Sequence, residues 1–314
     1  MFLLRSFIAI MGNRLLACRP MTPILEVRNL RKLFKQLVAV DGISFEMPPG
    51  ICFGLLGPNG AGKTTTIEMI EGITEPTSGE ILYRGKPRDK NFSLEAGIQF
   101  QATSVMEHLT SREILKLFHS LYPKAMPLPE LIELCELEPL LEQMTTHLSG
   151  GQKQRLMFAL SIINNPEIVF LDEPTTGLDP QSRRNLWRLI ERIKGQGKNV
   201  VLTTHYMDEA EILCDYLVII DHGKVIAEGA PEALLQEHFN HCYVCIDSAD
   251  FDAANKPFNE PVVQRNGHVE ILSRSVEATL QSLIQHNVGL NSLKVRNPTL
   301  EDLFLKLTGH NLRE

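Results

Sequence analysis

Hydrophobic and polar residues follow three patterns along this 314-residue chain. Several short runs are almost wholly apolar, which is typical of parallel strands covered by helices on both faces. Other short runs alternate apolar and polar residues and predict half-exposed strands, while longer segments place apolar residues at helical spacing. The apolar runs are residues 51–56, 168–171, 200–202 and 217–220, the alternating runs are 24–27 and 43–46, and the helical segments are 111–121 and 128–141.

The order of these segments predicts an α/β domain over residues 23–232, with a helical insertion at about 104–160. A further strand is expected at Glu80–Tyr83, after a turn signal. Asp221–Ala227 predicts a hairpin, and Pro231 predicts the start of a helix.

After about residue 238 the pattern changes. Short strand-like runs alternate with helical ones, which predicts a separate small α+β domain. We place this C-terminal accessory domain at residues 233–314. The strand-like runs are 243–246, 262–264 and 268–272, and the helical runs are 276–285 and 300–307.

Composition narrows the class of protein. Hydrophobic residues make up 43% of the chain and charged residues 22%, as in an ordinary globular protein. The net charge of −7 provides no general attraction to nucleic acid, so we expect no nucleic-acid partner. Six cysteines are scattered along the chain, which fits a reducing compartment better than a secreted disulfide framework.

The first residues form the longest apolar stretch, but Arg5 and Arg14 interrupt it. No apolar run reaches the roughly 18–20 residues that span a bilayer. We interpret residues 1–22 as an N-terminal extension, because Met21-Thr22-Pro23 resembles a natural beginning. A short signal-like or interfacial helix is the alternative.

Residues 57–65 carry the strongest chemical signal. They have the pattern G-x-x-x-x-G-K-[ST] between a predicted strand and a predicted helix, as in a phosphate-binding P-loop. Glycines allow successive backbone N–H groups to point at an anion, and the helix N-terminus adds partial positive charge. Lys63 supplies a full charge for the β- and γ-phosphates, and the Thr64 hydroxyl is a ligand for Mg²⁺. The loop consists of Gly57, Pro58, Asn59, Gly60, Ala61, Gly62, Lys63, Thr64 and Thr65.

Two carboxylates, Asp172 and Glu173, follow the apolar run 168–171. Open α/β sheets bind ligands at the carboxyl ends of their strands. We therefore predict that Asp172 holds Mg²⁺, directly or through water. Glu173 is predicted to act as general base on the attacking water.

A second glycine-containing segment, Leu148–Arg155, precedes the helical run 156–163. Ser149 is a candidate N-cap, and Gly150 and Gly151 leave backbone N–H groups open, so the segment is a helix start or a second anion site. One P-loop already holds the phosphates of one nucleotide. A second anion site therefore suggests a nucleotide shared with a second subunit.

These motifs together resemble those of the ATP-binding cassette (ABC) ATPases over residues 24–230, in that family's order. Residues 57–64 resemble the Walker A motif, 168–173 the Walker B motif and 148–155 the signature motif. The resemblance implies an α/β P-loop NTPase cassette. Such a cassette has a mixed sheet core, an antiparallel β edge and a helical subdomain.

The resemblance also implies roles for residues that carry little signal alone. Phe34 would lie against adenine. Gln101 would be the Q-loop glutamine that ligates Mg²⁺, with Gln99 as the alternative two residues earlier. His205 would be the switch histidine, which contacts the γ-phosphate and orients the water beside Glu173.

A further implication concerns a second copy of the chain. Ser149, Gly150, Gly151 and Gln152 of the signature motif, with Asp179 of a D-loop-like segment, would face the nucleotide held by that copy. Each ATP would then lie between two copies, and ATP binding would favour the closed dimer.

The tail Asn297–Gly309, with Thr299 capping a short amphipathic helix, resembles the end of drug-resistance-type and nodulation-factor-type exporter ATPases. The resemblance implies the ATPase subunit of an exporter, with ATP and Mg²⁺ as cofactors and multidrug or small-molecule efflux as its task. Its partner would be a separately encoded permease, at the cytoplasmic face of the inner membrane, where the chain would bind peripherally.

Two other functions remain as alternatives. One is an importer ATPase with a regulatory C-terminal domain, against which the exporter-like tail argues. The other is a soluble ATP-driven switch on ribosomes or DNA. A single cassette, the acidic net charge and the lack of sustained heptads argue against that switch.

His238, His241, Cys242 and Cys245 have the spacing H-x-x-H-C-x-x-C, which can indicate zinc. The strand expected there would direct residues three apart to opposite faces, and no second pair with ligand spacing follows. We therefore interpret the two cysteines as packing or surface residues.

Overall fold

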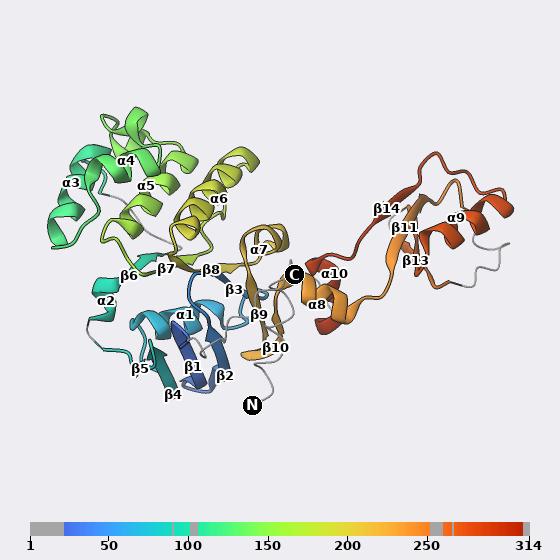
Figure 1. The fold of residues 1–314 in the computed structure, drawn as a ribbon, viewed down its shortest axis with the longest axis horizontal. Coiled ribbons are helices and arrows are strands. Elements are labelled where there is room, and N and C mark those ends of the chain that lie inside the picture. Colours follow the sequence, from blue (N-terminus) through green and yellow to red (C-terminus); the bar gives the residue numbers. More distant parts are fainter. Residues whose placement is uncertain (1–21, 90, 101–105, 252–259, 266, 310–314) are drawn as a thin grey trace, which may run out of the picture.

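The computed structural model describes residues 22–89, 91–100, 106–251, 260–265 and 267–309. Its largest sheet consists of β3 (Cys52–Leu56), β6 (Ala96–Gln99), β7 (Ile168–Asp172), β8 (Asn199–Thr204), β9 (Tyr216–Asp221) and β10 (Lys224–Gly229). The strand order is β10-β9-β3-β8-β7-β6, and all neighbours are parallel except the edge strand β10 (Figure 1). The predicted apolar strands and the hairpin are confirmed, whereas β6 is a strand that the apolar pattern does not predict.

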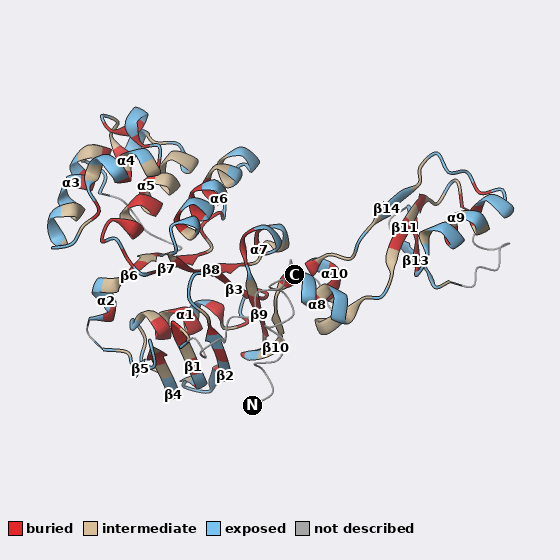
Figure 2. Cartoon of the chain, in the orientation of Figure 1, coloured by how far each residue is buried: buried red, intermediate tan, exposed pale blue. Residues whose placement is uncertain are grey.

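Both faces of this sheet are buried, which explains the unbroken apolar runs. In β7, Val169 and Leu171 belong to one core and Ile168 and Phe170 to another on the opposite face. Figure 2 shows the central strands as buried and the outward surfaces of the surrounding helices as exposed. Burial on two sides removes the polar alternation that a half-exposed strand would keep.

A second sheet covers one of these faces. It consists of β1 (Leu25–Phe34), β2 (Leu37–Met47), β4 (Ser78–Tyr83) and β5 (Lys86–Pro87) in the antiparallel order β2-β1-β4-β5. Helix α1 (Lys63–Glu71) shares the core between the two sheets. The strands are longer than the alternating pattern predicts, because β1 and β2 continue to a tight hairpin at Lys35, where φ is 52°.

The helical region lies on the other side of the large sheet (Figure 1). It contains α3 (Ser111–Leu121), α4 (Leu128–Leu134) and α5 (Gly150–Ile162). The prediction of a continuous helix over 128–141 is wrong, since Glu136 adopts a φ of 53° and Pro139 lies in a separate 3₁₀ turn. Helix α5 begins six residues before the predicted run, at a Ser149–Gln152 capping box.

Three other helices of the described chain were not predicted: α2 (Phe92–Glu95), α6 (Pro180–Gly195) and α7 (Met207–Leu213). For α6 the signals were present. Asp179 and Pro180 mark its start, and four apolar residues at helical spacing face the core. These are Leu186, Leu189, Ile190 and Ile193.

The C-terminal part forms a third, antiparallel sheet in the order β12-β13-β11-β14. Its strands are β11 (Cys242–Asp247), β12 (Val262–Arg265), β13 (His268–Ser273) and β14 (Lys294–Arg296), and α9 (Val276–Gln285) packs on it. This part also contains α8 (Pro231–His238) and α10 (Leu300–Thr308). These two helices instead join the core between the large sheet and the helical region, through Leu234, Leu300, Leu303 and Phe304. The domain boundary at residue 233 stays a prediction, but the last helix clearly returns to the larger domain.

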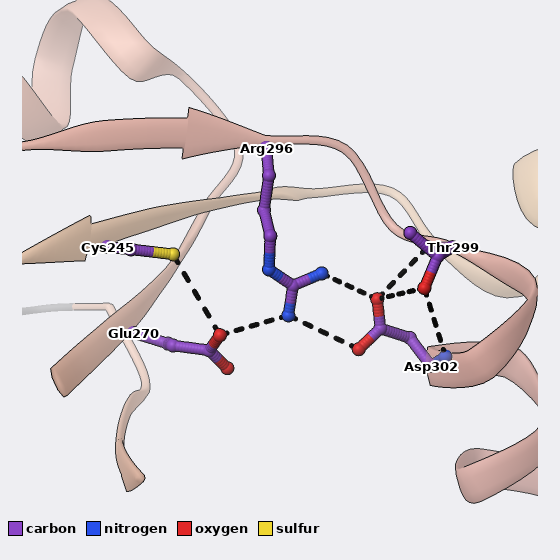
Figure 3. Close-up of polar contacts among 5 residues, drawn as sticks. All are labelled: Cys245, Glu270, Arg296, Thr299 and Asp302. Atoms are coloured by element: carbon purple, nitrogen blue, oxygen red, sulfur yellow. Dashed lines mark hydrogen bonds and ion pairs between the residues drawn. The ribbon is translucent and has the colours of Figure 1, made fainter. Parts of the chain in front are cut away.

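Arg296 ties the third sheet to α10 (Figure 3). Its guanidinium contacts Asp302 at 2.6 Å and 3.3 Å and Glu270 at 3.0 Å. Thr299 caps α10, as predicted, in a reciprocal capping box with Asp302. Partial burial works to raise the pKa of Asp302, but hydrogen bonds from Arg296 and Thr299 outweigh burial and hold this pKa below its ordinary value.

Replacing Arg296 with Met is expected to lower the free energy of unfolding by about 1 kcal/mol, a small value because the 33%-exposed guanidinium is screened by solvent. Because the pKa of Asp302 is lowered in the folded state, the ionised carboxylate stabilises the folded chain at pH values above its unfolded pKa of about 3.9. This stabilisation is lost as the pH falls through the lower, folded-state pKa. Urea unfolding at pH 7 and below pH 4 checks both points. Arg274→Met, at an exposed position, is the control, and an equal loss there would contradict the assignment.

The strand predicted in the histidine–cysteine segment is present as β11, which begins at Cys242. Cys242 Sγ donates to the Ser273 carbonyl oxygen at 3.5 Å, and Cys245 Sγ donates to Glu270 at 3.8 Å. Among the described residues, no group of three or more histidine, cysteine, aspartate and glutamate side chains is arranged to hold a metal ion. Likewise, none of the helices in the described ranges combines the length and apolar character that crossing a bilayer requires.

Candidate nucleotide-binding site

The loop between β3 and α1 has the backbone of an anion cradle. Gly62 has a φ of 101°, which residues with side chains rarely adopt. At Gly57 a Cβ atom would lie only 2.2 Å from the Ile220 carbonyl oxygen. The glycine pattern is therefore required by conformation at one position and by close packing at the other.

Lys63 is the first residue of α1, and its side chain is only 5% exposed. Its ammonium group donates to the carbonyl oxygens of Gly57 at 2.8 Å and Pro58 at 3.1 Å. Burial lowers the pKa of Lys63, and the carboxylates of Glu173 and Asp172 oppose this shift. The ammonium thus lies inside the loop where a phosphate would be held.

The two predicted carboxylates lie at the end of β7. Asp172 is 8% exposed and accepts a hydrogen bond from the Thr203 hydroxyl. Burial raises the pKa of Asp172, and the Thr203 hydrogen bond works against this shift. Glu173 Oε1 lies 3.8 Å from Lys63 Nζ, so the P-loop and both carboxylates form one cluster.

His205 follows β8 and completes the cluster. Its Nδ1 atom lies 3.2 Å from Glu173 Oε1, close enough for an ion pair when the imidazole is protonated but not aligned as a hydrogen bond. The Tyr206 ring lies against the imidazole, at 4.2 Å between centroids. The structure therefore brings together Lys63, Asp172, Glu173 and His205, which are 142 positions apart at the extremes (63 to 205).

A pocket of about 530 Å³ opens beside this cluster. Phe34 stands at its rim with 45% of its surface exposed, and Lys32 Nζ lies 5.0 Å from the ring centroid. An exposed ring of this kind is a stacking surface for a base. The other residues lining the pocket are Leu37, Val38, Ala39, Asn59, Gly60, Gly62, Lys63, Thr64, Thr65, Glu173, His222 and Gly223.

Comparisons with known proteins decide the family. The sequence profile described as "ABC transporter" matches residues 40–176. The Nod factor export ATP-binding protein I of Cupriavidus metallidurans is 37% identical over 305 residues, which cover 94% of this chain and 100% of that protein. This chain belongs to the ABC transporter family of ATP-binding proteins. As an ABC cassette it is an ATPase that binds ATP with Mg²⁺.

Solved ABC cassettes share the fold. The cassette cbiO1 of Clostridium perfringens, part of the ABC transporter complex cbiONQ, matches with a TM-score of 0.63 at 28% identity, covering 69% of this chain and 92% of that one. The dimeric bacterial cassette MJ0796 matches with a TM-score of 0.59 at 26% identity, covering 66% and 98%. The predicted fold class is confirmed.

The donor set of this ABC cassette fits Mg²⁺. Thr64 is an exposed hydroxyl on the pocket wall, and Asp172 is a carboxylate at the strand end nearby. Mg²⁺ prefers such oxygen ligands and keeps several waters beside them. Gln101, the third predicted ligand, lies outside the described residues. Gln99 is buried at the end of β6, and its Oε1 atom has no hydrogen-bond partner in the described chain.

The residues predicted to form the signature motif lie apart from this pocket. Ser149 and Gly150 are exposed at the start of α5, and the described pocket lining contains neither them nor Gly151 or Gln152. Asp179 has a structural role within its own chain that was not predicted. Its carboxylate caps α6, accepting from the backbone N–H groups of Gln181 and Ser182 at 3.0 Å each and from the Ser182 hydroxyl at 2.6 Å.

Two contacts of the site were missed by sequence reasoning. Thr203 holds Asp172, and its signal was a polar residue at the carboxyl end of an apolar strand. Gln154 in α5 donates to the Pro174 carbonyl oxygen, directly after Glu173, and no sequence signal pointed to that bond. The second contact connects α5, which begins within the predicted signature motif, to the residue after the predicted Walker B segment of the same chain.

Proposed function

We propose that this chain is the ATP-hydrolysing subunit of an export transporter, and that it drives a separately encoded membrane permease. The observation that carries this proposal is the relative named Nod factor export ATP-binding protein I, which is similar over 94% of the chain, accessory domain included. The tail Asn297–Gly309, which resembles the end of exporter ATPases, supports the same conclusion, and its helix α10 packs into the core of the cassette.

Hydrolysis would use the cluster around the P-loop. Lys63 and the loop N–H groups would hold the β- and γ-phosphates, with Phe34 against the base. Mg²⁺, held by Thr64 and Asp172 with Gln101, would neutralise charge on the phosphates when bound. Glu173 would take a proton from the attacking water, and His205 would orient that water and contact the γ-phosphate.

Two copies would complete each site. Ser149, Gly150 and Asp179 are exposed, Gly151 and Gln152 are half-buried, and none of them lines the described pocket of their own chain. They would therefore be available to the nucleotide of a second copy. A related cassette, MJ0796, is described as dimeric. ATP would favour the closed dimer because only that state contacts the nucleotide from both sides, and hydrolysis would release it.

The task of the assembly would be efflux of drugs or other small molecules, at the cytoplasmic face of the inner membrane. Specificity would reside in the permease, since the cassette presents ATP chemistry alone.

Co-expression with a candidate permease tests the proposal. The chain is expected to sediment with membranes only when the permease is present, and cells with both genes are expected to retain less of a fluorescent drug. The Lys63→Ala chain with the same permease is the control for ATP dependence. Co-sedimentation with ribosomes instead of membranes would contradict export. Equal drug retention with and without the pair would contradict drug efflux.

A further inference from the structure

Thr203 occupies a buried position between the two acidic residues of the site. It lies in β8 and pairs directly with Asp172 of the parallel neighbour β7. Its side chain is 1% exposed, and it does not line the nucleotide pocket. Thr203 therefore has no direct access to the nucleotide and can act only through its neighbours.

The Thr203 hydroxyl makes two hydrogen bonds of opposite sense. It donates to Asp172 Oδ1, and it accepts from the Glu173 backbone N–H at 3.0 Å. The same N–H also reaches the Thr203 carbonyl oxygen at 3.1 Å. One side chain thus holds the carboxylate of the first acidic residue and the backbone of the second.

Glu173 needs such support. Its φ is 46°, in the left-handed region that a residue with a side chain enters at a steric cost. Non-glycine residues persist there when surrounding contacts hold them, and such positions concentrate at functional sites. The contact that Thr203 makes lies at the peptide where the chain leaves β7 and turns.

We propose that Thr203 is a positioning residue for ATP hydrolysis, which orients Asp172 toward Mg²⁺ and fixes the backbone turn that presents Glu173 to water. This inference rests on the roles proposed above for Asp172 and Glu173. A valine would fill the same space, as Val200 and Val201 do in the same strand, but it could neither donate nor accept.

The test compares full-length chains carrying Thr203→Val and Thr203→Ser. In Thr203→Val, the Mg²⁺ concentration for half-maximal ATP hydrolysis is expected to rise roughly 10- to 100-fold, the usual effect of removing a group that orients a metal ligand. Its kcat is expected to fall, while affinity for a fluorescent ATP analogue in EDTA stays at the parental value. Thr203→Ser keeps both hydrogen bonds and is expected to behave like the parent.

Two controls separate positioning from folding. Thr279→Val removes a buried threonine hydroxyl that bonds to Ser273 and Glu260 in the accessory domain, and it is expected to leave Mg²⁺ dependence unchanged. Parental Mg²⁺ dependence and kcat in Thr203→Val would overturn the inference, as would equal defects in Thr203→Ser. Glu173→Gln, assayed alongside, separates a failure of the proposed function from a failure of this inference. If Glu173→Gln stays active, the role proposed for Glu173 is wrong, and not only the role of Thr203.

Discussion

Replacing Glu173 with Gln is expected to slow ATP hydrolysis by roughly 10²- to 10⁴-fold, the usual contribution of a general base, while ATP still binds. The amide keeps the shape of the side chain but cannot accept the proton of water. Glu173 also lies 3.8 Å from Lys63 and 3.2 Å from His205, so its carboxylate is at the centre of the cluster. With hydrolysis blocked, the ATP-bound dimer should accumulate.

Phosphate release and size-exclusion chromatography with ATP measure the two effects. Glu167→Gln is the matched control, because Glu167 precedes the opposite end of the same strand and pairs with Arg84 on the surface. We expect parental hydrolysis from this control. Parental turnover in Glu173→Gln would show that another group is the base.

Replacing Lys63 with Ala is expected to weaken ATP binding itself by roughly 10- to 150-fold, equivalent to about 1.5–3 kcal/mol for lost charge-assisted hydrogen bonds. The ammonium is buried and already lies against the loop carbonyls, so it needs little reorganisation to contact phosphates. No neighbouring cation of the described pocket lining replaces it.

Equilibrium binding of a fluorescent ATP analogue measures this loss, and thermal unfolding without nucleotide shows that the fold is intact. Lys86→Ala, at an exposed position of β5, is expected to bind normally. If Lys63→Ala bound ATP at parental affinity but hydrolysed it slowly, Lys63 would act in catalysis rather than in binding.

Much of the site was predictable because its signals are local in sequence. The P-loop is a continuous segment whose glycines are required by backbone conformation and close packing. Asp172 and Glu173 lie at the end of a single apolar strand. The contact of Thr203 with Asp172 was not predictable in this way. It depends on β7 and β8 being neighbours in register, and the two residues are 31 positions apart.

Tertiary packing and local backbone conformation explain the other differences between the elements predicted from the sequence and those in the structure. The sequence predicts that α10 is amphipathic, but the apolar face of a helix does not say which surface it covers. Leu300, Leu303 and Phe304 pack into the cassette core instead of the third sheet. The helix predicted over 128–141 ends early because Glu136 takes a left-handed conformation, which a periodic apolar pattern cannot indicate.

The central claim is that each ATP is held by the P-loop of one copy and the signature motif of another. Two variants test it when they are mixed at an ATP concentration too low to saturate Lys63→Ala. Lys63→Ala damages the P-loop. Gly150→Asp places a negative charge at the signature, where a new side chain meets no atom within 4 Å and an acidic residue suits a helix start. Gly150→Ala is the uncharged control.

The decisive measurement is ATP hydrolysis by an equal mixture of the Lys63→Ala and Gly150→Asp chains. In a shared-site dimer, a mixed pair contains one site with both defects and one with neither. We therefore expect hydrolysis to return to at most about one quarter of the parental rate if pairing is random and the two sites act independently. If each chain used its own signature motif, both chains would stay inactive and mixing would restore nothing.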